Sequence, residues 1–192
     1  MHLFVPEFVV ENAKENNHSG LFEVSVLSVE LNGLDRLLHD LLERSDTKAE
    51  DIFAVQNYIF TPVIEAIKNH GGFVVSLCSL LFSAMFPDSN RIGAINAVVS
   101  IRDFFDRSGN SINEFGDYAV SADIFLVRGE IEWFALPTKD DSIYWFSGPV
   151  FGKICEARRN RQSQQIVMEN GLLDSAGLQK KSINRDFCIL EN

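Results

Sequence analysis

The sequence predicts an α+β fold in which helices cover a mainly antiparallel sheet. Apolar residues recur at helical spacing over residues 34–42 and 50–69, and several short β-rich runs follow one another without a helix between them. Consecutive strands with short connections pair as antiparallel neighbours, and amphipathic helices bury their apolar sides against a sheet. A chain of 192 residues, 46% of them hydrophobic, is large enough for one core. We therefore expect a single domain over residues 1–192.

In the first half of the chain, strands alternate with helices. A lead-in segment over residues 1–20 contains an apolar piece, 3–10, expected to pack at an edge, and a polar stretch, 11–19, expected to form a loop. Asn32-Gly33 predicts a turn after the first strand, and Gly71-Gly72 predicts the end of the long helix. The expected strands are 21–31, 73–77 and 80–86, and the expected helices are 34–42, 50–69 and 91–107.

The second half begins with strands. Gly129 is expected to break a long β-rich stretch into two strands. Residues 160–192 are expected to form a C-terminal tail with the order strand, helix, strand. The expected strands of this half are 118–128, 130–136, 142–147, 165–168 and 187–190, and the expected helices are 150–159 and 172–176.

Charge and composition exclude several classes of function. The net charge is −10 and the sequence pI is about 4.8, so the chain would repel a nucleic-acid backbone. The longest apolar run, residues 73–86, is too short and too interrupted by serine to span a membrane. Cys78, Cys155 and Cys188 stand in apolar stretches without metal-ligand spacing, which is typical of buried thiols in a reducing compartment. These features predict a cytoplasmic protein without nucleic acid, membrane span, disulfide or zinc.

Four segments match a known family in their order and spacing. They are Phe4-Val5-Pro6, the helical stretch 49–60, His70-Gly71-Gly72 and Arg128-Gly129-Glu130-Ile131. In this order they resemble the class III adenylyl and guanylyl cyclases, and within them the soluble, bicarbonate-responsive type. The resemblance implies the ferredoxin-like fold of that family, and it identifies the last of the four segments with the family's central Gly-Glu hairpin.

The resemblance also assigns two metal-binding positions. Members of the family hold two metal ions with two aspartates, one at the end of the first strand and one in the hairpin, because paired hard cations need several anionic oxygens. Those positions hold Glu30 and Leu80 in this chain. Glu30 is one methylene longer than aspartate and is a weak candidate ligand, whereas Leu80 has no ligand atom. We expect no cofactor. Mg²⁺ or Mn²⁺ would be required only if the chain retains residual cyclase activity.

The family positions that recognise the base and the phosphates are also changed. The position of the adenine-reading lysine holds Ser76, and those of the helix asparagine and arginine hold Gly152 and Glu156. Glu156 reverses the charge of a group that stabilises phosphate in the transition state. The resemblance therefore implies a degenerate cyclase domain without catalytic residues.

Three functions remain open at this point. The first is a pseudo-cyclase that acts in cyclic nucleotide signalling by pairing with a cyclase-type domain or with itself, because the family's active site lies between two domains. The second is half of an adenylyl cyclase that makes cAMP from ATP with a partner, and the third is a non-catalytic nucleotide or bicarbonate sensor. The aromatic residues expected at a dimer interface are Trp133, Phe134, Tyr144 and Trp145.

Overall fold

The computed structural model describes residues 6–78, 80–108, 119–137, 142–161, 165–173 and 178–191. Its elements, in chain order, are α1 (Glu7–Lys14), β1 (Ser19–Asn32), α2 (Leu34–Glu43), α3 (Ala49–Asn69), β2 (Phe73–Cys78), β3 (Leu81–Pro87), the 3₁₀ helix η1 (Asp88–Asn90), α4 (Arg91–Ser108), β4 (Ser121–Pro137), β5 (Ser142–Ser147), α5 (Val150–Arg159), β6 (Ile166–Glu169), β7 (Lys180–Ser182) and β8 (Phe187–Leu190).

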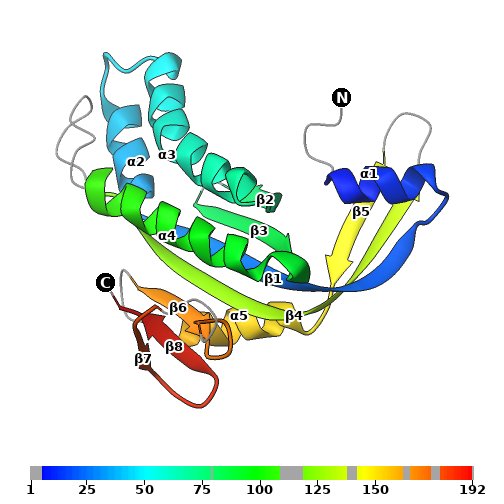
Figure 1. Cartoon of the computed structure of the whole chain (residues 1–192). Helices are drawn as coiled ribbons and strands as arrows, with labels where there is room; N and C mark the ends of the chain where they lie inside the picture. The colour runs from blue at the N-terminus through cyan, green and yellow to red at the C-terminus, as the bar shows by residue number, and fades with distance from the viewer. Residues whose placement is uncertain are drawn as a thin grey trace.

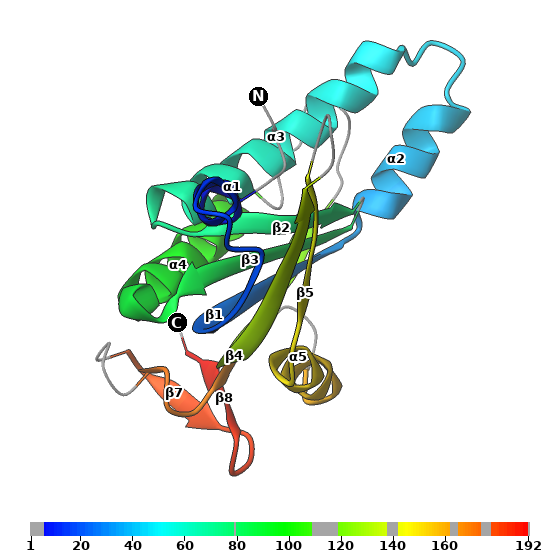
Figure 2. The same ribbon diagram turned by 90° about the vertical axis from the view of Figure 1, so that its right-hand side faces the viewer.

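One eight-stranded sheet organises the molecule. Its strand order is β2-β3-β1-β4-β6-β8-β7, and β5 pairs with β4 beside this path. All of these pairs are antiparallel except that of β4 with β6. In Figures 1 and 2, α4 and α5 lie on opposite sides of β1 and β4. The predicted α+β class with a mainly antiparallel sheet is confirmed.

Side chains of β1 alternate between two hydrophobic cores. Leu27 and Val29 belong to the larger core, which α2, α3 and α4 cover. Val24 and Val26 belong to the second core, which contains Val150 and other residues of α5. Because the side chains of a strand alternate with a period of two, the even-numbered residues of β1 lie on the α5 side of the sheet. This alternation decides which way each site residue points.

The lead-in segment differs from the expectation. Residues 11–19 were expected to be a loop, but α1 continues as a helix to Lys14 and β1 begins at Ser19. Phe8 and Val9 on α1 pack against Trp133, so tertiary packing stabilises a short helix that is marginal by itself. Residues 1–5 of the expected apolar piece lie outside the described residues.

Gly129 does not break the sheet, which corrects both the predicted strand boundary and the Gly-Glu hairpin. β4 is continuous, and Gly129 pairs with Val24 on β1. A Cβ atom at position 129 would lie 3.1 Å from the Cβ of Val150 on α5. The glycine therefore permits the close approach of α5 to the sheet rather than a turn.

Three other expectations concern the ends of elements and the cysteines. Residue 118 and most of the expected helix 172–176 lie outside the described residues, and the tail contains a strand, β7, that was not predicted. Cys188 is buried, but Cys78 and Cys155 are exposed, which corrects the prediction of three buried thiols. Within the described part of the chain, no helix combines the length and apolar character needed to cross a bilayer.

An ion-pair group joins η1 to the sheet. Arg91 and Arg128 donate to Asp88 at 2.8 and 2.6 Å, and these hydrogen bonds hold the pKa of Asp88 at about 2, below its ordinary value of 3.8. A depressed carboxylate pKa contributes stability that is present above pH 4 and is lost as the pH falls through about 2.

We predict that Asp88→Asn lowers the free energy of unfolding by about 1 kcal/mol at pH 7, after allowance for solvent screening of a partly exposed group. The difference from the native chain should shrink as the pH falls below 4 and be lost below about pH 2, because the native Asp88 becomes protonated around its pKa of about 2. Urea unfolding across a pH series measures it. Asp46→Asn, at an exposed loop position, is the control and should change little. A difference in the free energy of unfolding that persists unchanged at the lowest pH would contradict the stabilising role assigned to the Asp88 carboxylate.

Candidate functional site

The two positions assigned to metal binding lie side by side. Glu30 pairs with Leu81 across β1 and β3, and the backbone N–H of Leu31 donates to the carbonyl of Leu80 at 2.8 Å. The side chains diverge, however. Leu80 packs against the helix-covered core, whereas Glu30 lies on the α5 side of the sheet. Leu80 therefore acts as a packing residue in the hairpin turn.

Glu30 belongs to a group of four charged residues, which we call the arginine cluster: Glu30, Asp123, Arg158 and Arg161. Arg158, near the end of α5, lies 2.5 Å from a Glu30 carboxylate oxygen through its Nε atom, and it also donates to the hydroxyl of Ser28 at 3.1 Å. Arg161 forms an ion pair with the other Glu30 oxygen and lies 3.5 Å from Asp123. The arginines thus link the end of α5 to the end of β1.

Asp123 is the site residue that sequence reasoning missed. It pairs with Glu30 across β1 and β4, so both carboxylates lie on the same face of the sheet, and Asp123 is only 3% exposed. It accepts hydrogen bonds from the side chain of Asn32 at 3.2 Å and the backbone N–H of Gln165 at 3.3 Å. The available signal was a single carboxylate within the apolar run 122–127.

The charges of the arginine cluster are balanced within the chain. Two guanidinium groups face two carboxylates, and both oxygens of Glu30 are engaged by arginine. A metal ion would have to displace these arginines, and Leu80 could not supply a second ligand. The residues present therefore do not fit the two-metal centre of the class III cyclases.

The other assigned positions form no cluster with Glu30. Ser76 is exposed on β2, with its hydroxyl 3.9 Å from the sulfur of Cys78. Gly152 and Glu156 lie on the exposed side of α5, while Ile154 and Ala157 on the same helix are buried against the sheet. Arg158, two residues after Glu156, donates to Ser28 on β1.

The four aromatic residues assigned to an interface divide between two faces. Trp133 is 4% exposed and packs against Phe8 of α1, with ring centroids 5.6 Å apart. Tyr144 lies on the same face, where burial raises the pKa of its hydroxyl. Phe134 and Trp145 stack at 5.1 Å on the opposite face, and Trp145 is 43% exposed. While α1 remains packed, Trp133 is covered, Phe134 and Tyr144 are half-buried, and Trp145 is the exposed member of the four.

Comparison with solved structures relates this arrangement to known proteins. No protein-family model matches the sequence, and no curated protein matches it either. The guanylyl cyclase Cya2 superposes with a TM-score of 0.68 at 15% identity, covering 90% of this chain and 92% of that one. The adenylyl cyclase CyaB from P. aeruginosa superposes with a TM-score of 0.69 at 9% identity, covering 91% and 96%.

A third structure, a non-canonical dimeric guanylyl cyclase domain of a RhoGC fusion protein from the aquatic fungus Blastocladiella emersonii, has a TM-score of 0.67 at 13% identity, covering 90% of this chain and 95% of that one. The chain has the class III nucleotide cyclase fold. Identities this low show the fold alone. The activities of these cyclases are therefore not carried over to this chain.

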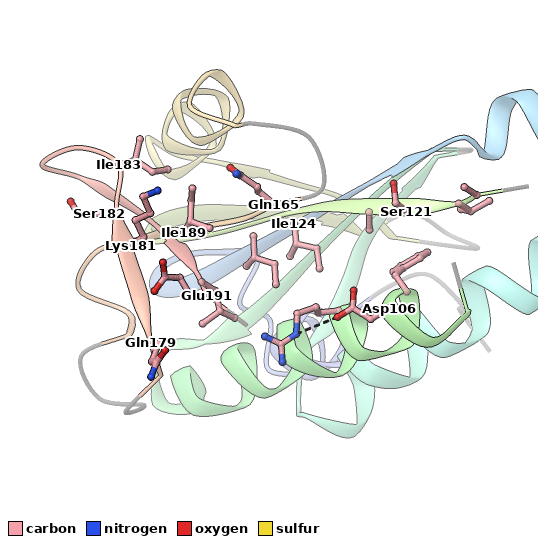
Figure 3. Close-up of a pocket in the computed structure, with 17 residues that line it drawn as sticks. Asp106, Ser121, Ile124, Gln165, Gln179, Lys181, Ser182, Ile183, Ile189 and Glu191 are labelled. Carbon is pink, nitrogen blue, oxygen red and sulfur yellow. Dashed lines mark ion pairs between the residues drawn. The ribbon is translucent and has the colours of Figure 1, made fainter. Parts of the chain in front are cut away.

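The cyclase fold of this chain also contains a cavity of about 850 Å³ that sequence reasoning did not anticipate (Figure 3). It lies between the end of α4, the start of β4 and strands β7 and β8. Ile124 lines it, and this residue belongs to the helix-covered core, so the cavity lies on the opposite face of the sheet from Asp123. Arg102 and Asp106 form an ion pair at 4.0 Å in its wall. None of the assigned cyclase positions lines this cavity.

Proposed function

We propose that this chain is a degenerate cyclase domain, a pseudo-enzyme that acts in cyclic nucleotide signalling by pairing with a cyclase-type domain or with a second copy of itself. The observation that carries the proposal is the engagement of Glu30 by Arg158 and Arg161. If Glu30 corresponds to the first metal-binding aspartate, then the chain's own cations hold the place where the family would bind a metal ion.

Two further features support the absence of catalytic activity. Leu80 has no ligand atom, and its side chain packs against the helix-covered core. The exposed side of α5 carries Gly152 and Glu156 where the family resemblance assigns an asparagine and an arginine. A triphosphate would meet a carboxylate there instead of a cation.

Pairing is supported by an apolar surface on the arm that β4 and β5 form. We call it the arm face, and its members come from β1, β4 and β5: Leu21, Phe134, Leu136, Ile143 and Trp145. All but Phe134 are exposed large hydrophobic residues, and they lie on the opposite side of the arm from α1. A contiguous apolar patch of this kind is typical of a protein contact.

The first test is turnover. The purified chain should form neither cyclic AMP from ATP nor cyclic GMP from GTP with Mg²⁺ or Mn²⁺. Glu30→Asp with Leu80→Asp should remain inactive, because Ser76, Gly152 and Glu156 are unchanged. Metal-dependent product above the level of heat-denatured chain would contradict the pseudo-enzyme. An active cyclase domain assayed in parallel controls for the assay.

The second test is association through the arm face. Trp145→Glu should weaken self-association or partner binding roughly tenfold or more, because it places a charge at the centre of a desolvated contact. The unfolding midpoint should change little, since Trp145 is 43% exposed. Sedimentation velocity over a concentration series measures self-association, and Phe53→Glu, at an exposed position on α3, is the matched control. A native chain that stays monomeric and binds no cyclase-type domain would overturn the pairing proposal.

A further inference from the structure

The outer edge of the sheet is open at β2. β2 is the terminal strand of the sheet order and pairs with β3 on one side only. In an antiparallel strand, every second residue directs its N–H and C=O away from the paired neighbour. The register shift between Val74 and Ser76 marks a bulge in β2, and Ser76, Leu77 and Cys78 are exposed. No strand in the described part of the chain pairs with this edge.

The open edge lies in a groove of about 860 Å³. One wall comes from the start of α1, where Phe8 packs against Phe73 with ring centroids 5.2 Å apart. The other wall comes from the end of α3, through Ile64 and Lys68. In Figure 1 the start of α1 faces this end of α3. The edge of β2 thus lies between two walls that are mainly apolar.

These walls suit the geometry of an added strand. A strand laid beside β2 would direct alternate side chains to opposite faces of the sheet. On one face they would meet the aromatic wall of Phe8 and Phe22, and on the other they would meet Ile64. The backbone of the added strand would pair with the outward N–H and C=O groups of β2. Main-chain pairing supplies affinity in this mode of recognition, and the alternate side chains supply specificity.

The charge of the groove selects among such strands. Lys68 is exposed and is the one charged residue among the described residues that line the groove. We propose that the β2 edge binds an extended peptide segment of a partner protein by β-strand addition, and that this segment has apolar residues at alternate positions and a carboxylate next to Lys68. A second copy presenting its own β2 would bring two Lys68 residues into one contact, which disfavours that occupant. The proposal holds whether or not the chain turns over nucleotide.

The experiment selects random octapeptides, displayed on phage, against the chain of residues 1–192. The enriched peptides should carry β-branched or aromatic residues at alternate positions and an aspartate or glutamate near one end. With an enriched peptide bound, amide hydrogen exchange should slow in residues 73–78. N-methylation of the alternate peptide nitrogens that face β2 should weaken binding more than tenfold. The methyl groups remove the hydrogen bonds to β2 and keep the two strands apart.

Charge reversal provides the matched comparison. Lys68→Glu should weaken binding of the acidic peptide about fivefold and improve binding of the same peptide with lysine in place of its acid. Lys181→Glu makes the same charge change in the cavity of Figure 3 and should alter neither affinity. The proposal is overturned by enrichment of no peptide or of basic peptides, by protection away from β2, or by indifference to N-methylation. It is also overturned if sedimentation and exchange data show two β2 edges paired in a dimer.

Discussion

Replacing Arg158 and Arg161 together by methionine should lower the free energy of unfolding by about 2 kcal/mol, after allowance for solvent screening of partly exposed arginines. The two substitutions remove both cations of the arginine cluster and leave Glu30 and Asp123 facing each other on neighbouring strands. Asp123 is 3% exposed, so water cannot replace the lost charge partner fully. Removing the partner of a buried charge leaves that charge uncompensated, but Arg158 and Arg161 are 31% and 41% exposed, so solvent reduces the loss below that of a fully buried pair.

Urea unfolding at neutral pH measures this loss. Arg159→Met is the matched control, because Arg159 is exposed on the same helix end and lies outside the cluster. It should change the free energy of unfolding by less than about 0.5 kcal/mol. Equal effects of the double variant and the control would show that the cluster contributes nothing to the fold. They would also remove the main support for a structural role of Glu30, the position that the family resemblance assigns to metal binding.

The same variant tests whether the arginines occupy the place of a metal ion. With both guanidinium groups removed, Mn²⁺ should bind between Glu30 and Asp123 and recover part of the lost stability, whereas the native chain should not respond. Calorimetric titration of Mn²⁺ into both proteins supplies a readout that does not depend on enzymatic activity. Binding to the native chain with comparable affinity would show that the arginines do not exclude a metal ion.

Local patterns in the sequence were sufficient for most of the fold. The alternation in β1, the helical spacing over 34–42 and 50–69 and the stop at Gly71-Gly72 are set by neighbours in the chain, so periodicity and turn chemistry reveal them. Gly129 misled the prediction because a glycine that breaks a strand and a glycine that admits a helix look the same in one dimension. Only the proximity of Val150 distinguishes them.

The site was harder to predict because its contacts are long-range. Arg161 and Glu30 are 131 positions apart, and Ser28 and Arg158 are 130 apart. The sequence shows an arginine-rich helix end, which is equally consistent with a solvated surface. The aromatic residues of the arm were grouped by type, although strand alternation already separates Trp133 from Phe134. Placing Trp133 and Trp145 on different faces also needs the register between β4 and β5, which pairs Phe134 with Trp145 and is not visible in the sequence.

Trp133→Ala should destabilise the chain by about 3 kcal/mol and release α1 from the arm. Trp133 is 4% exposed and forms the centre of a small core with Phe8 and Val9, which are the apolar anchors of α1. A helix of eight residues has little stability of its own, so its order depends on this contact. Loss of the indole leaves a cavity that the neighbouring strands of the arm cannot fill by relaxation alone.

Two measurements separate this role from a role in a partner contact. Hydrogen exchange and limited proteolysis should increase within residues 7–14 of the Trp133→Ala chain, and the unfolding midpoint should fall. Trp145→Ala is the matched control on the same arm and should cost less than about 1 kcal/mol, because Trp145 is 43% exposed and packs chiefly on Phe134. If the two variants unfold alike and α1 stays protected in both, Trp133 does not anchor the helix. That result would favour the original assignment of Trp133 to a partner interface, in a complex where α1 is displaced from the arm.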